Sequence, residues 1–327
     1  MIEVSSLSKR YGNFLAVDDV SFSIKKGEVV GFLGPNGAGK STIMNIVTGY
    51  LSLTQGTVTV DGYDILEEPE QAKRRIGYLP EIPPLYTDMT VYEYLAFVYD
   101  LKKVKFPKKP HIDEILRLVK IDNVKNKLIS KLSKGYRQRV GIAQALVGNP
   151  DVLILDEPTV GLDPKQIIEI RNLIARLGQN HTVIVSSHIL SEIQAVCERV
   201  IIINHGKIVA DSTPDELSRE LSNDHSVVLR VAGTEDELTK ILSGVKGVQS
   251  VNCLGQKESG TLDFVVTPKA GADIRREISE RLASRNKYVV MLASNQLSLE
   301  QVFMRLTYEA DAAEIAAAAK NGKVGEK

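Results

Sequence analysis

The feature that constrains this chain most is a glycine-rich segment over residues 34–41, which reads Gly-Pro-Asn-Gly-Ala-Gly-Lys-Ser. The apolar run Val29–Leu33 precedes it as a strand would, and residues 42–48 after it are compatible with a helix. A glycine-rich turn between a strand and a helix presents backbone N–H groups and the positive end of the helix dipole to an anion. The segment therefore predicts a phosphate-binding loop; the alternative is a turn that binds nothing.

Different residues of this loop have different physical roles in binding a nucleotide. The glycines let the backbone bend around an anion, because glycine reaches positive φ at little cost. Lys40 is predicted to bridge the β- and γ-phosphates of a nucleotide, and the Ser41 hydroxyl to ligate Mg²⁺. We therefore expect the loop and the residue after it to bind ATP, that is Gly34, Pro35, Asn36, Gly37, Ala38, Gly39, Lys40, Ser41 and Thr42.

Two acidic residues follow a second apolar run. Residues 152–155 are continuously apolar, as is typical of a parallel strand buried on both faces, and Asp156 and Glu157 come next. The carboxyl ends of parallel strands border the ligand crevice, so we predict that Asp156 holds Mg²⁺ through its water shell. Glu157 is then the candidate general base for an attacking water. The alternative is an ordinary polar strand end before a turn at Pro158.

Two further segments point to the same chemistry. Ser133 precedes an amphipathic stretch, so it is placed to cap a helix and provides a second helix start that attracts anions. The apolar run Val183–Val185 indicates another buried strand, which ends at His188. Because this strand should end at the same sheet edge as Asp156, we expect His188 to reach the γ-phosphate.

In this order, from about residue 2 to 220, the motifs resemble the nucleotide-binding subunit of an ATP-binding cassette (ABC) transporter. The resemblance implies that Gly34–Thr42 is the Walker A loop and Leu153–Glu157 the Walker B strand with the catalytic glutamate. It also implies that Leu132–Tyr136 is the signature and that His188 is the switch histidine.

The same resemblance implies that Tyr11 stacks on adenine, for which an exposed structural tyrosine is the alternative. It implies that two copies of the chain sandwich two ATP molecules head to tail. Ser133 and Gly135 of one copy then meet the γ-phosphate held by Lys40 of the other. Asp163, in the D-loop Gly161–Asp163, joins the nucleotide-binding residues.

Two positions depart from the family pattern. Glu81 stands where glutamine is usual, and we expect its carboxylate to approach Mg²⁺, through water. Tyr136 also replaces a usual glutamine but leaves Ser133 and Gly135 intact. Both replacements resemble the ATPases that pair with separately encoded type-2 ABC permeases, often in export. As a hypothesis, a groove beside Glu81 and Tyr86 receives a cytoplasmic helix of that permease.

The composition agrees with a cytosolic subunit, and the resemblance implies a cytoplasmic protein that is peripheral on the inner face of the cell membrane through its permease. Lysine plus arginine and aspartate plus glutamate number 41 each, which argues against broad binding to nucleic acid. No run approaches the roughly 18 apolar residues of a membrane span, and we expect no signal peptide. Cys197 and Cys253 have no paired spacing, so neither a disulfide framework nor a zinc site is expected.

The predicted fold class is an α/β P-loop cassette with a mixed core sheet, an antiparallel β subdomain and an inserted helical subdomain, followed by a ferredoxin-like domain. We expect the ATP-binding domain over residues 1–220, with the helical subdomain at about 86–135. The basic segment Lys102–Lys109 is predicted to be a solvated linker, with a patch that binds lipid or nucleic acid as the alternative. Residues 221–308 are expected to form a βαββαβ accessory domain closed by a helix from Ser298, and residues 309–327 a helical or disordered tail.

These observations predict an ATPase that drives transmembrane transport, with export favoured by resemblance. One alternative is a non-transport ABC protein that acts on nucleic acid or the ribosome, although the chain shows no long coiled-coil insertion or zinc module. Another is a regulatory module that senses ATP without consuming it. Glu157 and His188 argue against that module, because both serve hydrolysis rather than binding.

Overall fold

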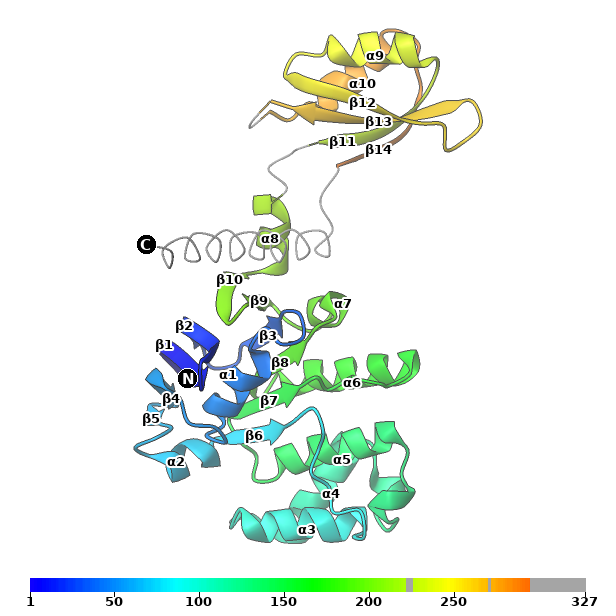
Figure 1. Cartoon of the computed structure of the whole chain (residues 1–327). Helices are drawn as coiled ribbons and strands as arrows, with labels where there is room; N and C mark the ends of the chain where they lie inside the picture. The colour runs from blue at the N-terminus through cyan, green and yellow to red at the C-terminus, as the bar shows by residue number, and fades with distance from the viewer. Residues whose placement is uncertain (222–225, 270–271, 295–327) are drawn as a thin grey trace, which may run out of the picture. The chain divides into compact units, whose positions relative to one another are not determined.

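Figure 1 shows the computed structural model, which describes residues 1–221, 226–269 and 272–294. Chain contacts divide the molecule into two compact units, of which the first is Met1–Pro214 and the second begins at Asp215. The helix α8 (Pro214–Leu221) starts at this division. The closing helix expected from Ser298 and the tail expected over residues 309–327 lie outside the described residues.

The first unit is built around a central sheet with the strand order β10-β9-β3-β8-β7-β6. The neighbours from β9 to β6 pair in parallel, and β10 is antiparallel to β9. Apolar runs form the middle strands because both faces of the sheet are covered. The strands are β3 (Val29–Leu33), β6 (Ile76–Leu79), β7 (Val152–Asp156), β8 (Thr182–Ser187), β9 (Arg199–Asn204) and β10 (Lys207–Ser212).

A second, antiparallel sheet has the order β2-β1-β4-β5. Its strands are β1 (Ile2–Tyr11), β2 (Phe14–Ile24), β4 (Gln55–Val60) and β5 (Tyr63–Asp64). Phe22 of β2 meets Phe32 of β3 edge to face, with ring centroids 5.2 Å apart, so one hydrophobic core joins both sheets. The helix α1 (Lys40–Val47) buries Ile43 and Met44 in this core, which fixes the start of the helix after β3.

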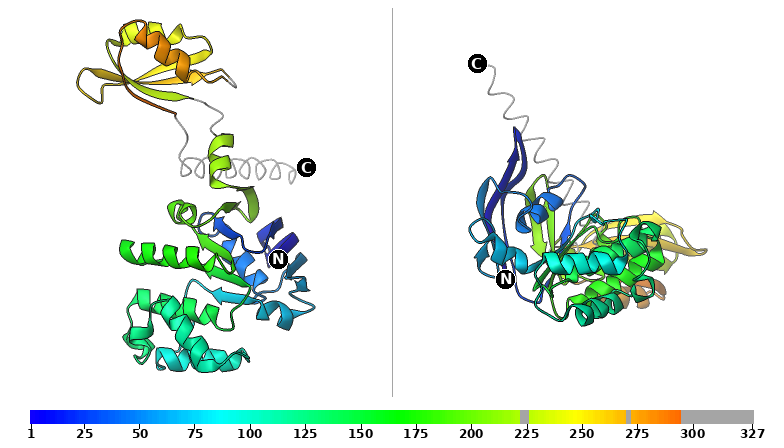
Figure 2. Two further views of the ribbon diagram at one scale, coloured as in Figure 1. Left: turned by 180° about the vertical axis from the view of Figure 1, so that it is seen from behind. Right: turned by 90° about the horizontal axis from the view of Figure 1, so that it is seen from below.

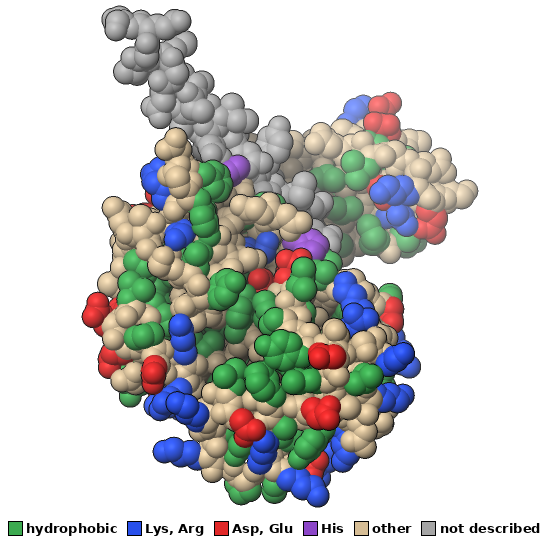
Figure 3. Space-filling model, turned by 60° about the horizontal axis from the view of Figure 1, so that its bottom comes forward, with side chains coloured by type: hydrophobic (Ala, Val, Ile, Leu, Met, Phe, Trp, Pro, Cys, Tyr) green, Lys and Arg blue, Asp and Glu red, His purple; other side chains and the backbone are tan. Residues whose placement is uncertain are grey.

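Helices α3 (Val91–Leu101), α4 (Lys108–Leu118) and α5 (Lys134–Leu146) gather beside the β6 edge of the central sheet and form the helical subdomain (Figures 1 and 2). Thr90 caps α3 with a capping box, because its hydroxyl accepts from the Glu93 N–H while the Glu93 carboxylate accepts from the Thr90 N–H. The surface of this part comes forward in Figure 3, which shows hydrophobic side chains between charged ones.

The prediction of a solvated linker over Lys102–Lys109 is wrong at both ends. Lys102 lies just after α3 and donates a hydrogen bond over 2.9 Å to the carbonyl of Val147, at the end of α5. Burial of this ammonium lowers the pKa of Lys102 to about 8. Lys108 already begins α4 and pairs with Asp100. The segment between α3 and α4 is therefore shorter than expected and tied to α5.

Three further α-helices belong to the first unit: α2 (Pro69–Arg74), α6 (Pro164–Leu177) and α7 (Leu190–Gln194). Asp163 caps α6, because its carboxylate accepts a hydrogen bond of 2.9 Å from the Gln166 N–H. In the described part of the chain, no helix combines the length and the apolarity that crossing a membrane requires.

The second unit has the predicted element order βαββαβ. It consists of β11 (Val227–Ala232), α9 (Glu235–Ser243), β12 (Val248–Gly255), β13 (Thr261–Pro268), α10 (Arg275–Ala283) and β14 (Val289–Ser294). The strand order β12-β13-β11-β14 is antiparallel throughout. Alternate residues of β11 pack with Phe264, Leu238 and Ile278 in a core of their own. The predicted ferredoxin-like arrangement is confirmed.

Candidate functional site

The glycine-rich loop joins β3 to α1 and is shaped by close backbone approaches. Gly39 caps α1 with φ of 108°, a left-handed conformation that glycine adopts without strain. At Gly34, a Cβ atom would lie 2.2 Å from the carbonyl oxygen of Ile203, so no larger residue fits without moving the backbone. The sequence therefore forms a compact loop at the carboxyl end of β3, with the start of α1 directed at its hollow.

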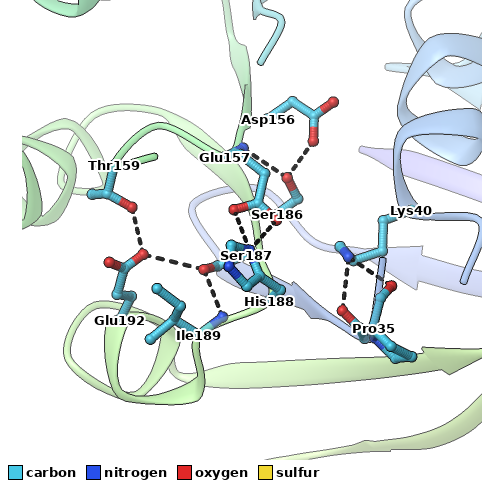
Figure 4. Close-up of polar contacts among 11 residues, drawn as sticks. Pro35, Lys40, Asp156, Glu157, Thr159, Ser186, Ser187, His188, Ile189 and Glu192 are labelled. Atoms are coloured by element: carbon cyan, nitrogen blue, oxygen red, sulfur yellow. Dashed lines mark hydrogen bonds and ion pairs between the residues drawn. The ribbon is translucent and has the colours of Figure 1, made fainter. Parts of the chain in front are cut away.

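Lys40 folds back over this loop (Figure 4). Its Nζ donates to the carbonyl oxygens of Gly34, at 2.7 Å, and Pro35, at 3.1 Å. The side chain is buried, and burial lowers the pKa of Lys40, whereas the carboxylates of Glu157, Asp156 and Glu81 raise it. The neighbouring carboxylates favour the charged form of Lys40, and the resulting ammonium group at the loop is suited to bind a phosphate.

The two acidic residues lie side by side at the end of β7, as the sequence predicts. Parallel pairing places Asp156 opposite Ser186 of β8. The Ser186 hydroxyl donates to Oδ1 of Asp156 and accepts a hydrogen bond of 2.9 Å from the Glu157 N–H (Figure 4). Both carboxylates are buried. Ser186 therefore fixes their relative positions, a role that the sequence alone did not indicate.

His188 follows β8 and contacts Glu157. Its Nδ1 atom lies 3.0 Å from Oε1 and 3.0 Å from Oε2 of that carboxylate. Burial raises the pKa of Glu157, while the hydrogen bond from His188 and its charge lower it. Glu157 also has a left-handed backbone, with φ of 48°, which costs a residue with a Cβ roughly 1–2 kcal/mol. Such strain is typical of functional positions.

Lys40, Glu157 and His188 border one cavity of about 580 Å³. The sequence predicted most of its lining, but not Phe14, Ala16 and Val160. Tyr11 and Phe14 flank the turn between β1 and β2 and are 47% and 65% exposed, so their rings are open to a planar ligand. The predicted residues in the lining are Tyr11, Asn36, Gly37, Gly39, Lys40, Ser41, Thr42, Glu81, Glu157 and His188.

The other predicted residues do not line this cavity. Gly34, Pro35 and Ala38 belong to the loop but are not in the lining, and Asp156 lies opposite Ser186 on the neighbouring strand. Residues Ser133, Gly135 and Asp163 form a separate group at the starts of α5 and α6. There the Ser133 hydroxyl accepts from the Tyr136 N–H at 3.5 Å, and a Cβ atom at Gly135 would lie 2.5 Å from Oε1 of Gln166. Ser133 and Asp163 are exposed.

Comparisons with known proteins point to one family. A family model described as "ABC transporter" matches residues 17–160. The linearmycin resistance ATP-binding protein LnrL of Bacillus subtilis (strain 168) is 33% identical over 314 residues, which are 94% of this chain and 98% of that protein. The bacitracin transport ATP-binding protein BcrA of Bacillus licheniformis is 40% identical over 221 residues, which are 67% of this chain and 72% of that protein.

Solved structures agree with these sequence matches. A structure of an ATP-binding subunit of an ABC transporter has a TM-score of 0.63 and 29% identity, and covers 68% of this chain and 93% of its own. A dimeric post-hydrolysis structure of the ATP-binding cassette MJ0796 bound to ADP and Pi has a TM-score of 0.60 and 27% identity. That match covers 65% of this chain and 98% of MJ0796.

Proposed function

The chain belongs to the ABC transporter family as an ATP-binding subunit, and from this premise we propose how its residues hydrolyse ATP and drive export through a separate permease. It is an ATPase of a transport system. The proposal rests on one observation: Lys40, Glu157 and His188 share one cavity with the phosphate-binding loop. The ATP-binding domain is proposed to span residues 1–220 and the accessory domain residues 221–308.

The loop is proposed to hold the triphosphate. The backbone N–H groups of residues 34–42 and the start of α1 attract the phosphates, and Lys40 leaves the carbonyls of Gly34 and Pro35 to bind the β- and γ-phosphates. Tyr11 stacks on the adenine ring, and the exposed ring of Phe14 offers a second apolar face beside it. A nucleotide is therefore held by charge at one end and by stacking at the other.

Mg²⁺ is part of the proposal. In the described part of the chain, no cluster of three or more His, Cys, Asp or Glu side chains is suited to a metal ion. The Ser41 hydroxyl and the Asp156 carboxylate are oxygen donors, which fit Mg²⁺, since this ion usually takes one or two protein oxygens together with phosphate oxygens and water. Ser41 and Asp156 would hold it, with Glu81 near it through water. When bound, Mg²⁺ supplies positive charge that stabilises the transferring phosphoryl group.

Glu157 is proposed to position and deprotonate the attacking water. Its carboxylate borders the cavity, and burial raises its pKa above that of an exposed glutamate, which makes it a better proton acceptor. His188 orients Glu157 through Nδ1 and lies where its ring can contact the γ-phosphate. Lys40 and His188 then stabilise the negative charge that spreads over the transferring phosphate.

A second copy of the chain is proposed to complete the site head to tail. Ser133, Gly135 and Asp163 lie at two helix starts, away from the cavity of their own copy, and Ser133 and Asp163 are exposed. A partner's γ-phosphate could be bound by the N–H groups at the start of α5. Dimeric structures of related cassettes support a dimer, whereas the head-to-tail arrangement is part of the proposal. Hydrolysis removes the phosphate bridge, so the dimer opens.

The permease is proposed to contact an aromatic surface near Glu81. Ile82 is 83% exposed and Tyr86 is 50% exposed, and Tyr86 packs edge to face on Phe97 with centroids 5.5 Å apart. A cytoplasmic helix of the permease would bury its apolar face there, which places the chain on the inner side of the membrane. The relatives named for bacitracin, linearmycin and lantibiotic systems support export.

A mixing experiment tests the head-to-tail site. Lys40→Met removes the phosphate ligand from one copy, and Ser133→Arg blocks the surface of the other. Each variant alone should be inactive, but a head-to-tail mixture contains dimers with one intact site, so ATPase activity should return to about a quarter of the wild-type value. If each site were built within one copy, the mixture would stay as inactive as its components.

A further inference from the structure

Two neighbouring serines at the end of β8 face different partners. Ser186 binds Asp156 and the Glu157 N–H, as described above. The Ser187 hydroxyl instead donates over 3.1 Å to Oε2 of Glu192, in α7, and accepts a hydrogen bond of 3.0 Å from the Ile189 N–H (Figure 4). Successive residues of a strand point to opposite faces, so Ser186 contacts Asp156 while Ser187 contacts α7 on the other side of the strand.

Glu192 is unusual because its carboxylate is buried and, among the residues that the structure describes, no cation pairs with it. Its side chain is buried, and within residues 1–221, 226–269 and 272–294 no lysine, arginine or histidine forms an ion pair with it. A buried carboxylate without a cation is costly unless hydrogen bonds compensate for lost water. Glu192 has such bonds, because the Thr159 hydroxyl also donates to Oε2. We call these three residues, Thr159, Glu192 and Ser187, the clamp, because one carboxylate oxygen binds the hydroxyl groups of both other residues.

The clamp joins the two segments that carry Glu157 and His188. Thr159 follows Glu157 in a tight turn, in which the Val160 N–H donates to the Glu157 carbonyl over 3.2 Å. Ser187 directly precedes His188. Since both hydroxyls bind the same oxygen, a movement of either segment breaks a buried hydrogen bond. Glu192 itself is not one of the residues that line the cavity.

We propose that Glu192 is a positioning residue for hydrolysis: through Thr159 and Ser187 it holds Glu157 and His188 at the separation that the reaction requires. The Thr159–Glu192–Ser187 clamp also fixes the beginning of the turn that leads to Asp163, since the Leu162 N–H donates to the Thr159 carbonyl. A movement of Asp163 at the proposed dimer surface can therefore shift Glu157 and His188 through this turn and the clamp. This inference rests on the proposed roles of Glu157 and His188.

Three variants of the full chain test the clamp. Glu192→Ala removes both acceptor bonds and should lower kcat about 10- to 100-fold, because a small displacement of the base costs that much, while KM for ATP stays within about twofold. Glu192→Gln keeps an oxygen that accepts from both hydroxyls, so kcat should stay within about threefold of wild type. Glu198→Ala removes an exposed glutamate that follows α7 and should change neither constant.

Hydrogen exchange of the same proteins provides a readout that does not depend on turnover. In Glu192→Ala, amides of residues 157–163 and 187–189 should exchange faster, while those of α3 stay unchanged. If that variant does not fold, Thr159→Val removes one bond of the clamp with little change in shape and should show a smaller effect of the same kind.

Three outcomes would overturn the clamp proposal. In the first, Glu192→Ala has wild-type kcat; in the second, the glutamine and alanine variants lose kcat equally; in the third, exchange rises across the whole first unit. A wild-type protein that releases no phosphate from ATP would instead refute the proposed function, which keeps the two failures apart.

Discussion

Nδ1 of His188 lies 3.0 Å from both carboxylate oxygens of Glu157. The ring nitrogen is equally close to both oxygens, so the histidine and the glutamate orient each other within the protein itself. The contact joins the ends of β7 and β8, which are neighbouring parallel strands. The contact therefore depends on the register of the central sheet. Substitutions at the end of either strand should change the rate of hydrolysis more than the affinity for ATP.

Glu157→Gln is expected to separate binding from hydrolysis. The amide keeps the shape of the side chain but accepts no proton, so turnover should fall about 100- to 10,000-fold. ATP should still bind and hold the dimer closed, because the loop and Lys40 are untouched. Phosphate release measures the first effect, and size-exclusion chromatography with ATP the second. The exposed Glu198→Gln is the control. Unchanged hydrolysis would remove Glu157 from the role of base.

The contact between His188 and Glu157 predicts a specific pH dependence. Glu157 accepts a proton only when ionised, so kcat falls as pH drops through its pKa. Burial raises this pKa and the His188 hydrogen bond lowers it. Removing that bond in His188→Ala should therefore raise the pKa further and shift the acid limb of the residual kcat to higher pH.

The control for this prediction is His188→Gln. Its amide still donates to the carboxylate but carries no charge, so its acid limb should shift less than that of the alanine variant. Profiles of phosphate release between acid and neutral pH give the comparison. An acid limb that stays in place, or moves to lower pH, in His188→Ala would contradict the assigned cause.

Lys40→Met should weaken ATP binding. Hydrogen bonds to charged groups contribute about 1.5–3 kcal/mol, so the dissociation constant should rise about 10- to 150-fold. Isothermal titration with ATP measures the change, and Lys26→Met, at an exposed lysine, serves as the matched control. Equal affinity in the two variants would mean that Lys40 keeps its bonds to the Gly34 and Pro35 carbonyls when nucleotide binds.

Tyr86→Ala tests the surface assigned to the permease. The side chain is half exposed and packs on Tyr94 and Phe97, so its removal flattens the aromatic surface without opening the core. In the reconstituted complex, transport should fall while basal ATPase of the isolated subunit stays near wild type. Tyr288→Ala, at an exposed tyrosine of the second unit, is the control. A parallel loss of both activities would refute the assigned surface.

The fold class follows from sequence because its signals are local. Val29–Leu33, Val152–Leu155 and Val183–Val185 are apolar throughout, and each forms a buried strand of one parallel sheet. The rule that polar residues at the carboxyl ends of such strands meet at one edge brings Glu157 and His188 together without any long-range information. The roles of these residues in hydrolysis stay predictions.

Other parts of the site depend on tertiary register and had no sequence signal. Ser186 and Ser187 look alike in the sequence, and only the pairing of β7 with β8 sends one to Asp156 and the other to Glu192. Lys102 looked solvated because lysine usually is, yet the end of α5 offers its ammonium a carbonyl. The hydrogen-bond partners of these side chains are decided by packing between segments that lie far apart in the chain.

The left-handed backbone at Glu157 has a consequence for directed evolution of this protein. At that conformation glycine is the relaxed choice, so Glu157→Gly should gain thermal stability while deleting the carboxylate. A library selected for heat resistance alone would accordingly enrich inactive clones at one predictable codon. Selection for turnover would keep the glutamate and accept a lower melting temperature, so stability and activity are opposed at a single position.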